Sequence, residues 1–398
     1  MTVLALPRTR HAPTALGACL LSFAAFVIAQ RAADVSMIDL MVYRAEGWTV
    51  RTGGDLYALR ATYADLPTTY PPFAALLFLP LTLLDVETMK VAATALNLAL
   101  LFGLVHLSLR LVRRHARVEH ALWAAAVAVW CEPVWTTLRY GQVNLLLAVL
   151  VLWDLTRRPG HHWAGVGIGV AAAIKLTPAL FTVFLLCTGL AQLARGGAWR
   201  PWVRGACVAV GSFVCVTVLT AVVLPRDSRH FWTRMVFESD RPGHAEETGN
   251  QSLRGVLARL LHTGDPGAWW AVAAALTALV GLTVAVAAAL RGRRAQAAMA
   301  CATTALLISP VSWSHHWVWC VPLALLVWES RRQKTALALA LAFCSYALWW
   351  VPHADGMPEL HQNAGESMLS ALYVAVACAF LAYAAYAEVR LWRTSRSA

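Results

Sequence analysis

The chain has 398 residues, of which 59% are hydrophobic and 14% are charged, and its mean hydropathy is +0.58. Soluble domains are about half apolar and about a quarter charged, so this composition excludes an ordinary soluble enzyme and indicates a polytopic membrane protein. A net charge of +12 would suggest a nucleic-acid partner in a soluble protein, but here the basic residues form short clusters between apolar runs. Such clusters set orientation in the membrane, so we expect a lipid bilayer and no nucleic acid among the partners.

The apolar runs predict an all-α protein. At about 20 residues for each crossing, we expect about twelve transmembrane helices in a single domain of residues 1–398. They are expected over residues 15–32, 88–110, 119–135, 141–156, 163–174, 176–194, 203–224, 267–290, 296–312, 315–329, 334–351 and 367–389. The segment 72–84 is too short to cross comfortably and predicts a re-entrant or interfacial helix. The loop before it, 33–70, mixes charges with aromatic residues, which is typical of short interfacial helices.

The basic clusters fall in alternate loops, so all of them can be cytoplasmic, together with both termini. They lie at residues 8–10, 110–117, 157–158, 195–204, 291–294, 331–334 and 390–396. Nearly all residues capable of chemistry lie in loops of the opposite face. This predicts one extracytoplasmic site assembled from several loops. The nine cysteines have no CxxC or zinc-ligand spacing and are interpreted as small apolar residues.

Asp39 is the central candidate residue, because it follows the first long apolar run at the outer rim of the membrane. Burial there could raise its proton affinity enough for it to act as a general base. The alternative is an ordinary solvated acid such as Asp34 or Asp55. Tyr70, followed by two prolines, by itself predicts an extended bend and a helix start.

Two amide-rich motifs could contact a substrate. Gln142 and Asn144 open a predicted helix, where their side chains could bind hydroxyl groups or simply cap the helix. Asn250, Gln251 and Arg254 belong to a similar helix start, which suits a sugar or phosphate and equally suits a loop that only packs.

Lys175 lies between two apolar runs, where an ammonium is costly unless it is paired or hydrated. Thr177 and Pro178 predict a broken helix, which typically lines a water-filled cavity, so we favour a phosphate partner for Lys175 over a snorkelling side chain. His315 and His316 are adjacent and usually point to different faces, with no carboxylate at i+4. Hydrogen bonds to phosphate or sugar are therefore favoured over a metal.

Together these motifs resemble glycosyltransferase family 87, the actinobacterial membrane mannosyltransferases that use a polyprenyl phosphate mannose donor. The resemblance runs from about residue 36 to 320 through Asp39 with Tyr43, Tyr70-Pro71-Pro72, Gly141-Gln142-Val143-Asn144, Lys175-Leu176-Thr177-Pro178, Asn250-Gln251-Ser252-Leu253 and the segment 309–316. It implies a GT-C membrane fold in the plasma membrane. It also implies an inverting hexosyl transfer on the extracytoplasmic side that forms α-(1→2) linkages on lipoglycans or phosphatidylinositol mannosides. Asp39 matches the family's catalytic base.

This chemistry needs one base to take the proton of the acceptor hydroxyl. The phosphate leaves as an anion, so cations rather than a general acid should stabilise it; Lys175, Arg254 and His315 or His316 are the candidates. No cofactor or divalent metal is expected. The expected partners are a polyprenyl-phosphate sugar donor and a lipid-anchored glycan acceptor.

Two alternatives remain open at this stage. A related GT-C enzyme could transfer arabinofuranose or another lipid-linked sugar. A transporter or flippase belongs to a different class, but transporters usually place their site near the midplane and often have inverted repeats, and the sequence has no evident repeat.

Overall fold

The computed structural model describes residues 12–113, 116–158, 160–238, 241, 243–353 and 356–394. These residues are almost entirely helical, apart from one short antiparallel hairpin of β1 (Arg60–Ala61) and β2 (Leu66–Pro67). The all-α prediction is confirmed. The basic cluster predicted at residues 8–10 lies outside the described residues, as do Arg114 of the cluster 110–117 and Arg396 of the cluster 390–396.

Within the described residues, five helices are long and apolar enough to cross a bilayer: α1 (Ala12–Ala32), α4 (Val86–Val112), α10 (Arg200–Val223), α13 (Gly267–Leu290) and α18 (Leu372–Thr394). A sixth is possible if α5 (Val118–Ala128) and α6 (Glu132–Tyr140) count as one span bent by 79°. The chain is therefore a multi-pass membrane protein, and the finer count of twelve crossings stays a prediction.

Shorter helices complete the bundle. They are α7 (Asn144–Leu155), α8 (Val166–Ile174), α9 (Ala179–Ala194), α14 (Arg294–Ile308), α15 (Cys320–Glu329), α16 (Gln333–Cys344) and α17 (Ala364–Ser370), with 3₁₀ turns η3 (Ser314–Trp319), η4 (Ala347–Trp350) and η5 (Pro358–His361). Pro133 explains one difference from the predicted helix over 119–135. Proline is favoured in the first turn of a helix but breaks its interior, so a new helix starts at Glu132 after the bend.

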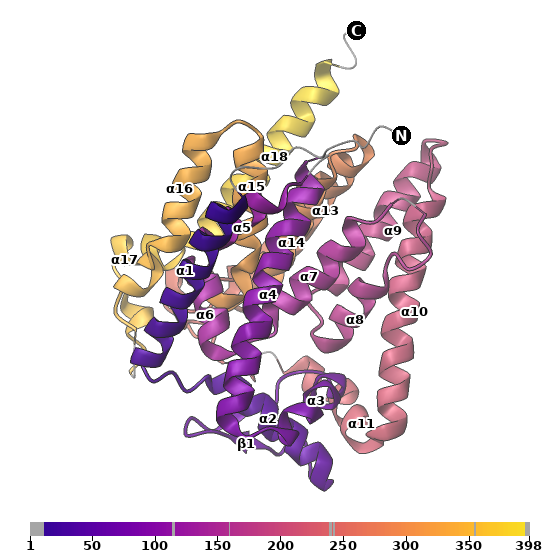
Figure 1. The fold of residues 1–398 in the computed structure, drawn as a ribbon. Coiled ribbons are helices and arrows are strands. Elements are labelled where there is room, and N and C mark those ends of the chain that lie inside the picture. The colour runs from indigo at the N-terminus through magenta and orange to yellow at the C-terminus, as the bar shows by residue number, and fades with distance from the viewer. Residues whose placement is uncertain are drawn as a thin grey trace, which may run out of the picture.

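Short helices gather at one end of the molecule. They include α2 (Ile38–Thr52), α3 (Pro72–Phe78) with η1 (Leu79–Leu83), and α11 (Pro225–Thr233) with η2 (Met235–Phe237); α12 (Leu253–Leu260) comes later in the chain. Figure 1 shows α2, α3, α11 and the hairpin together, while α1 begins and α18 ends toward the opposite end. The segment 33–70 thus contains one short helix, α2, of the kind expected from its composition, together with the hairpin. Their depth in a membrane stays a prediction.

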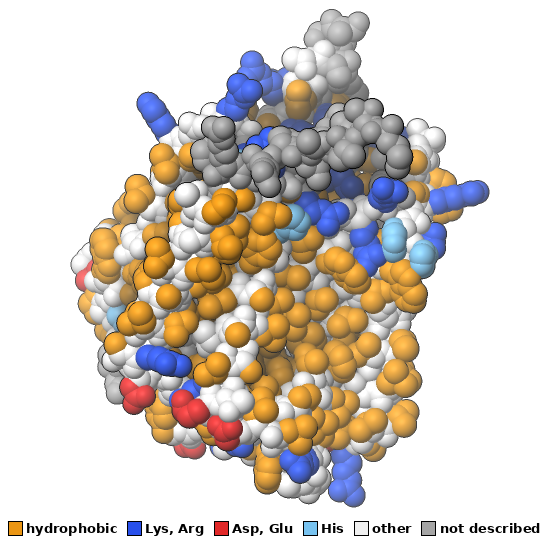
Figure 2. All heavy atoms as spheres, in the orientation of Figure 1, with side chains coloured by type: hydrophobic (Ala, Val, Ile, Leu, Met, Phe, Trp, Pro, Cys, Tyr) orange, Lys and Arg blue, Asp and Glu red, His pale blue; other side chains and the backbone are white. Residues whose placement is uncertain are grey.

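The surface follows the same division. On the face in Figure 2, a broad apolar zone separates an end rich in Lys and Arg, where α18 terminates, from an end that carries acidic and basic side chains. An apolar belt between two polar ends is the pattern expected for a membrane protein.

Glu132 links four parts of this fold. Its side chain is fully buried and accepts hydrogen bonds from Thr136, Ser314, Trp349 and Tyr373 at 2.8–3.0 Å. These donors belong to α6, η3, η4 and α18. A buried carboxylate is tolerated only when its oxygens are satisfied in this way.

We expect Glu132→Ala to destabilise the fold strongly, because it leaves four donors unpaired and each unsatisfied buried group costs about 1–3 kcal/mol. The measurement is the thermal unfolding midpoint in detergent. Glu87→Ala is the matched control, since the Glu87 side chain is 82% exposed and, within the described residues, pairs only with Lys90 on the same helix. Equal midpoints for the two variants would contradict this role for Glu132.

Candidate active site

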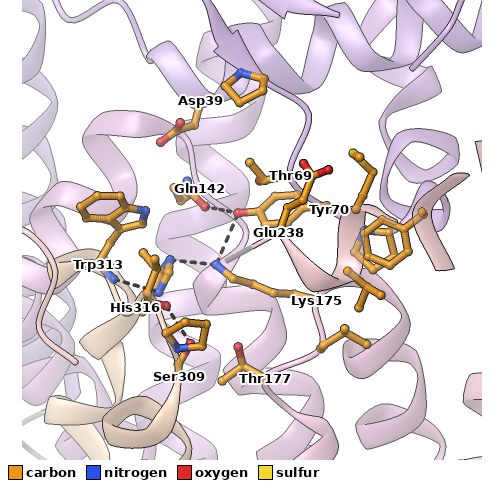
Figure 3. Close-up of a pocket in the computed structure, with 18 of the residues that line it drawn as sticks. Asp39, Thr69, Tyr70, Gln142, Lys175, Thr177, Glu238, Ser309, Trp313 and His316 are labelled. Carbon is orange, nitrogen blue, oxygen red and sulfur yellow. Dashed lines mark hydrogen bonds between the residues drawn. The ribbon is translucent and has the colours of Figure 1, made fainter. Parts of the chain in front are cut away.

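Asp39 lies in the first turn of α2, where a carboxylate interacts favourably with the helix N-terminus. Its side chain lines a cavity of about 540 Å³, together with Glu46, Tyr70, Gln142, Lys175 and His316. We call this the Lys175 cavity. Figure 3 shows Lys175 at its centre, with His316 to one side and Asp39 beyond Gln142 and Tyr70. The segments that supply these residues come from four separate parts of the chain.

A hydrogen-bonded network links the two tyrosines to Gln142. The hydroxyl groups of Tyr43 and Tyr70 both donate to Oε1 of Gln142, at 2.6 and 3.0 Å. Gly141 makes the turn that presents Gln142, with φ of 71°, and a Cβ added there would lie 2.6 Å from Cβ of Leu40. Only glycine fits this turn without strain or displacement of α2.

Lys175 ends α8 in an extended conformation, in the break before α9. Its Nζ lies 2.8 Å from Nε2 of His316 and 3.4 Å from Oη of Tyr70. Burial lowers the pKa of Lys175 to about 7, although the charge of Asp39 opposes this shift. The ammonium and neutral amine forms are therefore both accessible near neutral pH.

The contacts of His316 bear on the protonation of Lys175. The backbone N–H of Trp313 donates to Nδ1 of His316 at 3.1 Å, so the proton of a neutral imidazole resides on Nε2. That N–H points at Nζ of Lys175, which must then accept as a neutral amine. Once Lys175 is protonated, both its ammonium and the Nε2–H of His316 can donate hydrogen bonds to an anion bound between the two side chains.

Three carboxylates line the cavity, those of Asp39, Glu46 and Glu238. Burial raises the pKa of Asp39 to about 6, while Gln142 and the charge of Lys175 favour its ionised form. Burial also raises the pKa of Glu46 to about 8, with a further contribution from Asp39. Near pH 7 Asp39 is mostly ionised and Glu46 mostly protonated, which gives the two groups different chemical roles.

Glu46 was missed by the sequence analysis. It lies seven residues, or two helical turns, after Asp39 on the buried face of α2, and its Oε2 has no hydrogen-bond partner among the described residues. The spacing of Asp39, Tyr43 and Glu46 on one helical face could have indicated it, had the helix been recognised as starting at Ile38.

Several predicted site residues lie elsewhere. Asn250 and Gln251 are fully buried, and their amides bind backbone groups of Pro310, Ser312 and Ser370. Arg254 lies over the ring of Trp270 and 3.9 Å from Asp265. None of these three lines the Lys175 cavity. Their positions suit a role in holding the loops around it.

The remaining two predicted residues lie just beside the Lys175 cavity. Asn144 donates to the backbone oxygen of His315 at 3.1 Å and lines a small adjoining space with Lys175 and His316. His315 packs edge-on against Tyr140 and faces a different cavity from His316. The two histidines therefore point in different directions, as adjacent residues usually do.

Comparison with known proteins gives the family. The profile of glycosyltransferase family 87 matches residues 69–310, more than half of the chain. The chain belongs to glycosyltransferase family 87. It is a membrane glycosyltransferase, as the motif resemblance implied.

Similar proteins of known activity support this membership of family 87. One is the polyprenol-phosphate-mannose-dependent alpha-(1-2)-phosphatidylinositol mannoside mannosyltransferase of Mycobacterium tuberculosis, which is 34% identical over 347 residues, or 81% of this chain and 77% of the relative. Another is the corresponding pentamannoside mannosyltransferase of Mycolicibacterium smegmatis, 34% identical over 310 residues, or 76% of this chain and 71% of the relative. Among solved structures, ArnT from Cupriavidus metallidurans bound to undecaprenyl phosphate aligns with 93% of this chain and 78% of its own chain, at 16% identity and a TM-score of 0.42.

Proposed function

We propose that this family 87 enzyme transfers mannose, with inversion, from a polyprenyl phosphate donor to a lipid-anchored mannoside such as a phosphatidylinositol mannoside or lipoglycan, forming an α-(1→2) linkage. The observation that carries the proposal is the placement of the carboxylate of Asp39 and the amine of Lys175 on one cavity. The named activities of the similar mycobacterial proteins support the choice of mannose and of the linkage.

The reaction needs three groups of this site. Asp39 takes the proton of the acceptor hydroxyl as that oxygen bonds to the anomeric carbon. The bond between the anomeric carbon and the phosphate oxygen breaks, and its electron pair leaves with the phosphate. Lys175 and His316 donate hydrogen bonds to the departing phosphate and stabilise the negative charge that develops on it.

Glu46 has a different role in this scheme. Its raised pKa keeps it protonated near pH 7, so it does not compete with Asp39 for the acceptor proton. Its unpartnered Oε2 can instead exchange a hydrogen bond with a hydroxyl group of the donor sugar.

We also infer that the Lys175 cavity faces the extracytoplasmic side of the plasma membrane, with both termini in the cytoplasm. The Lys- and Arg-rich end of the molecule, where α18 terminates, supports this orientation because cytoplasmic loops carry an excess of basic residues. The apolar lining near Leu176, Leu180 and Ile308 suits the tail of a lipid donor.

The pH dependence of kcat/KM for the donor is expected to form a narrow bell. Activity falls below about pH 6 because Asp39 becomes protonated, and falls above about pH 7 because Lys175 loses its charge. Lys175→Arg should extend the alkaline limb, since a guanidinium stays protonated. Initial rates at subsaturating donor across this range test the profile, and a wild-type rate that keeps rising to pH 9 would contradict it.

The direct test of the function is transfer of labelled mannose from polyprenyl phosphate mannose to a mannoside acceptor in membranes that contain the chain. The expected product carries a new α-(1→2)-linked mannose, identified by linkage-specific mannosidase digestion. Transfer of arabinofuranose but not mannose under the same conditions would replace the proposed donor.

A further inference from the structure

A second cavity, of about 690 Å³, meets the Lys175 cavity at Asp39. We call it the His315 cavity. The two cavities share four lining residues, Asp39, Leu66, Gln142 and Trp313. Asp39 therefore lies where the two cavities meet. A general base needs this position if it takes the proton of an acceptor hydroxyl in one cavity while that oxygen attacks the donor sugar in the other.

The charges of the two cavities differ. The His315 cavity is lined by four carboxylates, those of Asp39, Glu246, Glu247 and Glu359, and by no Lys or Arg among its described residues. The Lys175 cavity is also lined by three carboxylates, those of Asp39, Glu46 and Glu238, but it holds a lysine amine within hydrogen-bond distance of His316. A phosphate group is therefore favoured in the Lys175 cavity and repelled from the His315 cavity.

Two buried polar atoms of the His315 cavity lack a partner. Nε2 of His315, on a side chain that is 6% exposed, has no hydrogen bond within the described residues, and neither does Oγ1 of Thr248, on a side chain that is 1% exposed. Both residues line the cavity. Buried polar atoms are usually hydrogen-bonded, so these two indicate a ligand that supplies the missing partners.

The remaining walls suit a sugar. Trp313 and Trp349 both line the His315 cavity, and Nε1 of Trp349 is already bound to Glu132, which leaves the ring rather than the nitrogen for the ligand. Apolar rings, carboxylates and isolated donors are the combination that binds the apolar faces and hydroxyl groups of a carbohydrate.

From this geometry we propose that the His315 cavity binds the acceptor as an uncharged sugar, with Thr248 and His315 contacting its hydroxyl groups, while the donor phosphate binds in the Lys175 cavity. The inference rests on the proposed function, since it divides the two substrates of that reaction between two spaces. It further requires that any phosphate of the acceptor lipid lies outside the His315 cavity.

The test measures binding of octyl α-mannoside, and of the same compound phosphorylated at its 6-hydroxyl, to the full chain in detergent without donor. The matched variants are Thr248→Val in the His315 cavity and Thr177→Val in the Lys175 cavity, which remove equivalent hydroxyl groups. We expect Thr248→Val to weaken neutral mannoside binding roughly 3- to 10-fold and Thr177→Val to leave it unchanged. The phosphorylated compound should bind at least roughly 10-fold more weakly to the wild type, and Glu247→Gln should narrow that difference.

Equal or tighter binding of the phosphorylated compound, no measurable wild-type binding up to about 10 mM, or weakening by Thr177→Val alone would each overturn the inference. The unfolding midpoint of each variant is checked first, and Glu247→Gln replaces Thr248→Val if the latter does not fold. The readout does not depend on the donor. If mannose transfer fails while this binding pattern holds, the donor is wrong and the acceptor cavity stands; if transfer succeeds without the pattern, only the cavity assignment fails.

Discussion

Asp39→Asn is expected to lower kcat for mannosyl transfer by roughly 10²- to 10⁴-fold, the contribution typical of a general base. The amide keeps the shape of the carboxylate and can still bond to Gln142, but it cannot accept the proton of the acceptor hydroxyl. KM for the donor should change little, because Lys175 and His316, the proposed phosphate ligands, keep their mutual contact. Initial rates in membranes at matched expression provide the measurement.

Asp34→Asn is the matched control for this substitution. Asp34 is exposed, lies in the same segment 33–70 and has φ of 45°, a conformation that asparagine also tolerates. We expect wild-type rates for it. If Asp39→Asn and the wild type transfer mannose equally fast, another group is the base, and Glu46 becomes the first residue to test.

Lys175→Met is expected to reduce kcat/KM for the donor by roughly 10²-fold, because a hydrogen bond to a charged group contributes about 1.5–3 kcal/mol and acts on the charge that develops on the phosphate. Methionine preserves much of the length and apolar stem of lysine. The space that the Lys175 side chain occupies beside Tyr70 and His316 should therefore stay filled. Steady-state kinetics with the donor varied at saturating acceptor provide the measurement.

Arg254→Met provides the comparison for the lysine variant, since both cations were candidates for the donor phosphate on sequence grounds. Arg254 is buried outside the Lys175 cavity. Its loss should therefore lower the unfolding midpoint and leave the KM for the donor nearly unchanged. A donor KM that rises more in Arg254→Met than in Lys175→Met would place the phosphate near Arg254 instead.

Hydropathy identified the helical regions of this chain because a helix that crosses a bilayer needs an apolar run of defined length. Their ends were less predictable. The helix expected over 119–135 breaks before Pro133, and the one expected over 334–351 ends at Cys344 before a 3₁₀ turn. Such ends depend on contacts made by distant segments, for example that between Trp349 and Glu132, which no local pattern records.

The site was predictable where a polar or charged residue lies in or beside an apolar segment, because burying such a residue without a partner costs free energy. Lys175 was identified in this way, Asp39 by its place after the first apolar run and His316 by its histidine neighbour, and all three line one cavity. Asn250 and Gln251 looked equally suitable because an amide that binds a sugar and an amide that binds a backbone group have the same sequence signature. Glu46 escaped notice because an acid in a short amphipathic helix is ordinarily solvated.

The hydrogen bond between Glu132 and Tyr373 joins the part of the chain that matches the family profile to a helix beyond residue 310, where that match ends. Loss of Glu132 would leave the buried hydroxyl of Tyr373 without this acceptor, whereas loss of Tyr373 would leave Glu132 with three of its four donors. Evolution at these two positions should therefore be concerted: across family 87, lineages that replace the acid at 132 should also replace the phenol at 373. Substitution at position 373 of the last helix is then restricted by the residue that occupies position 132.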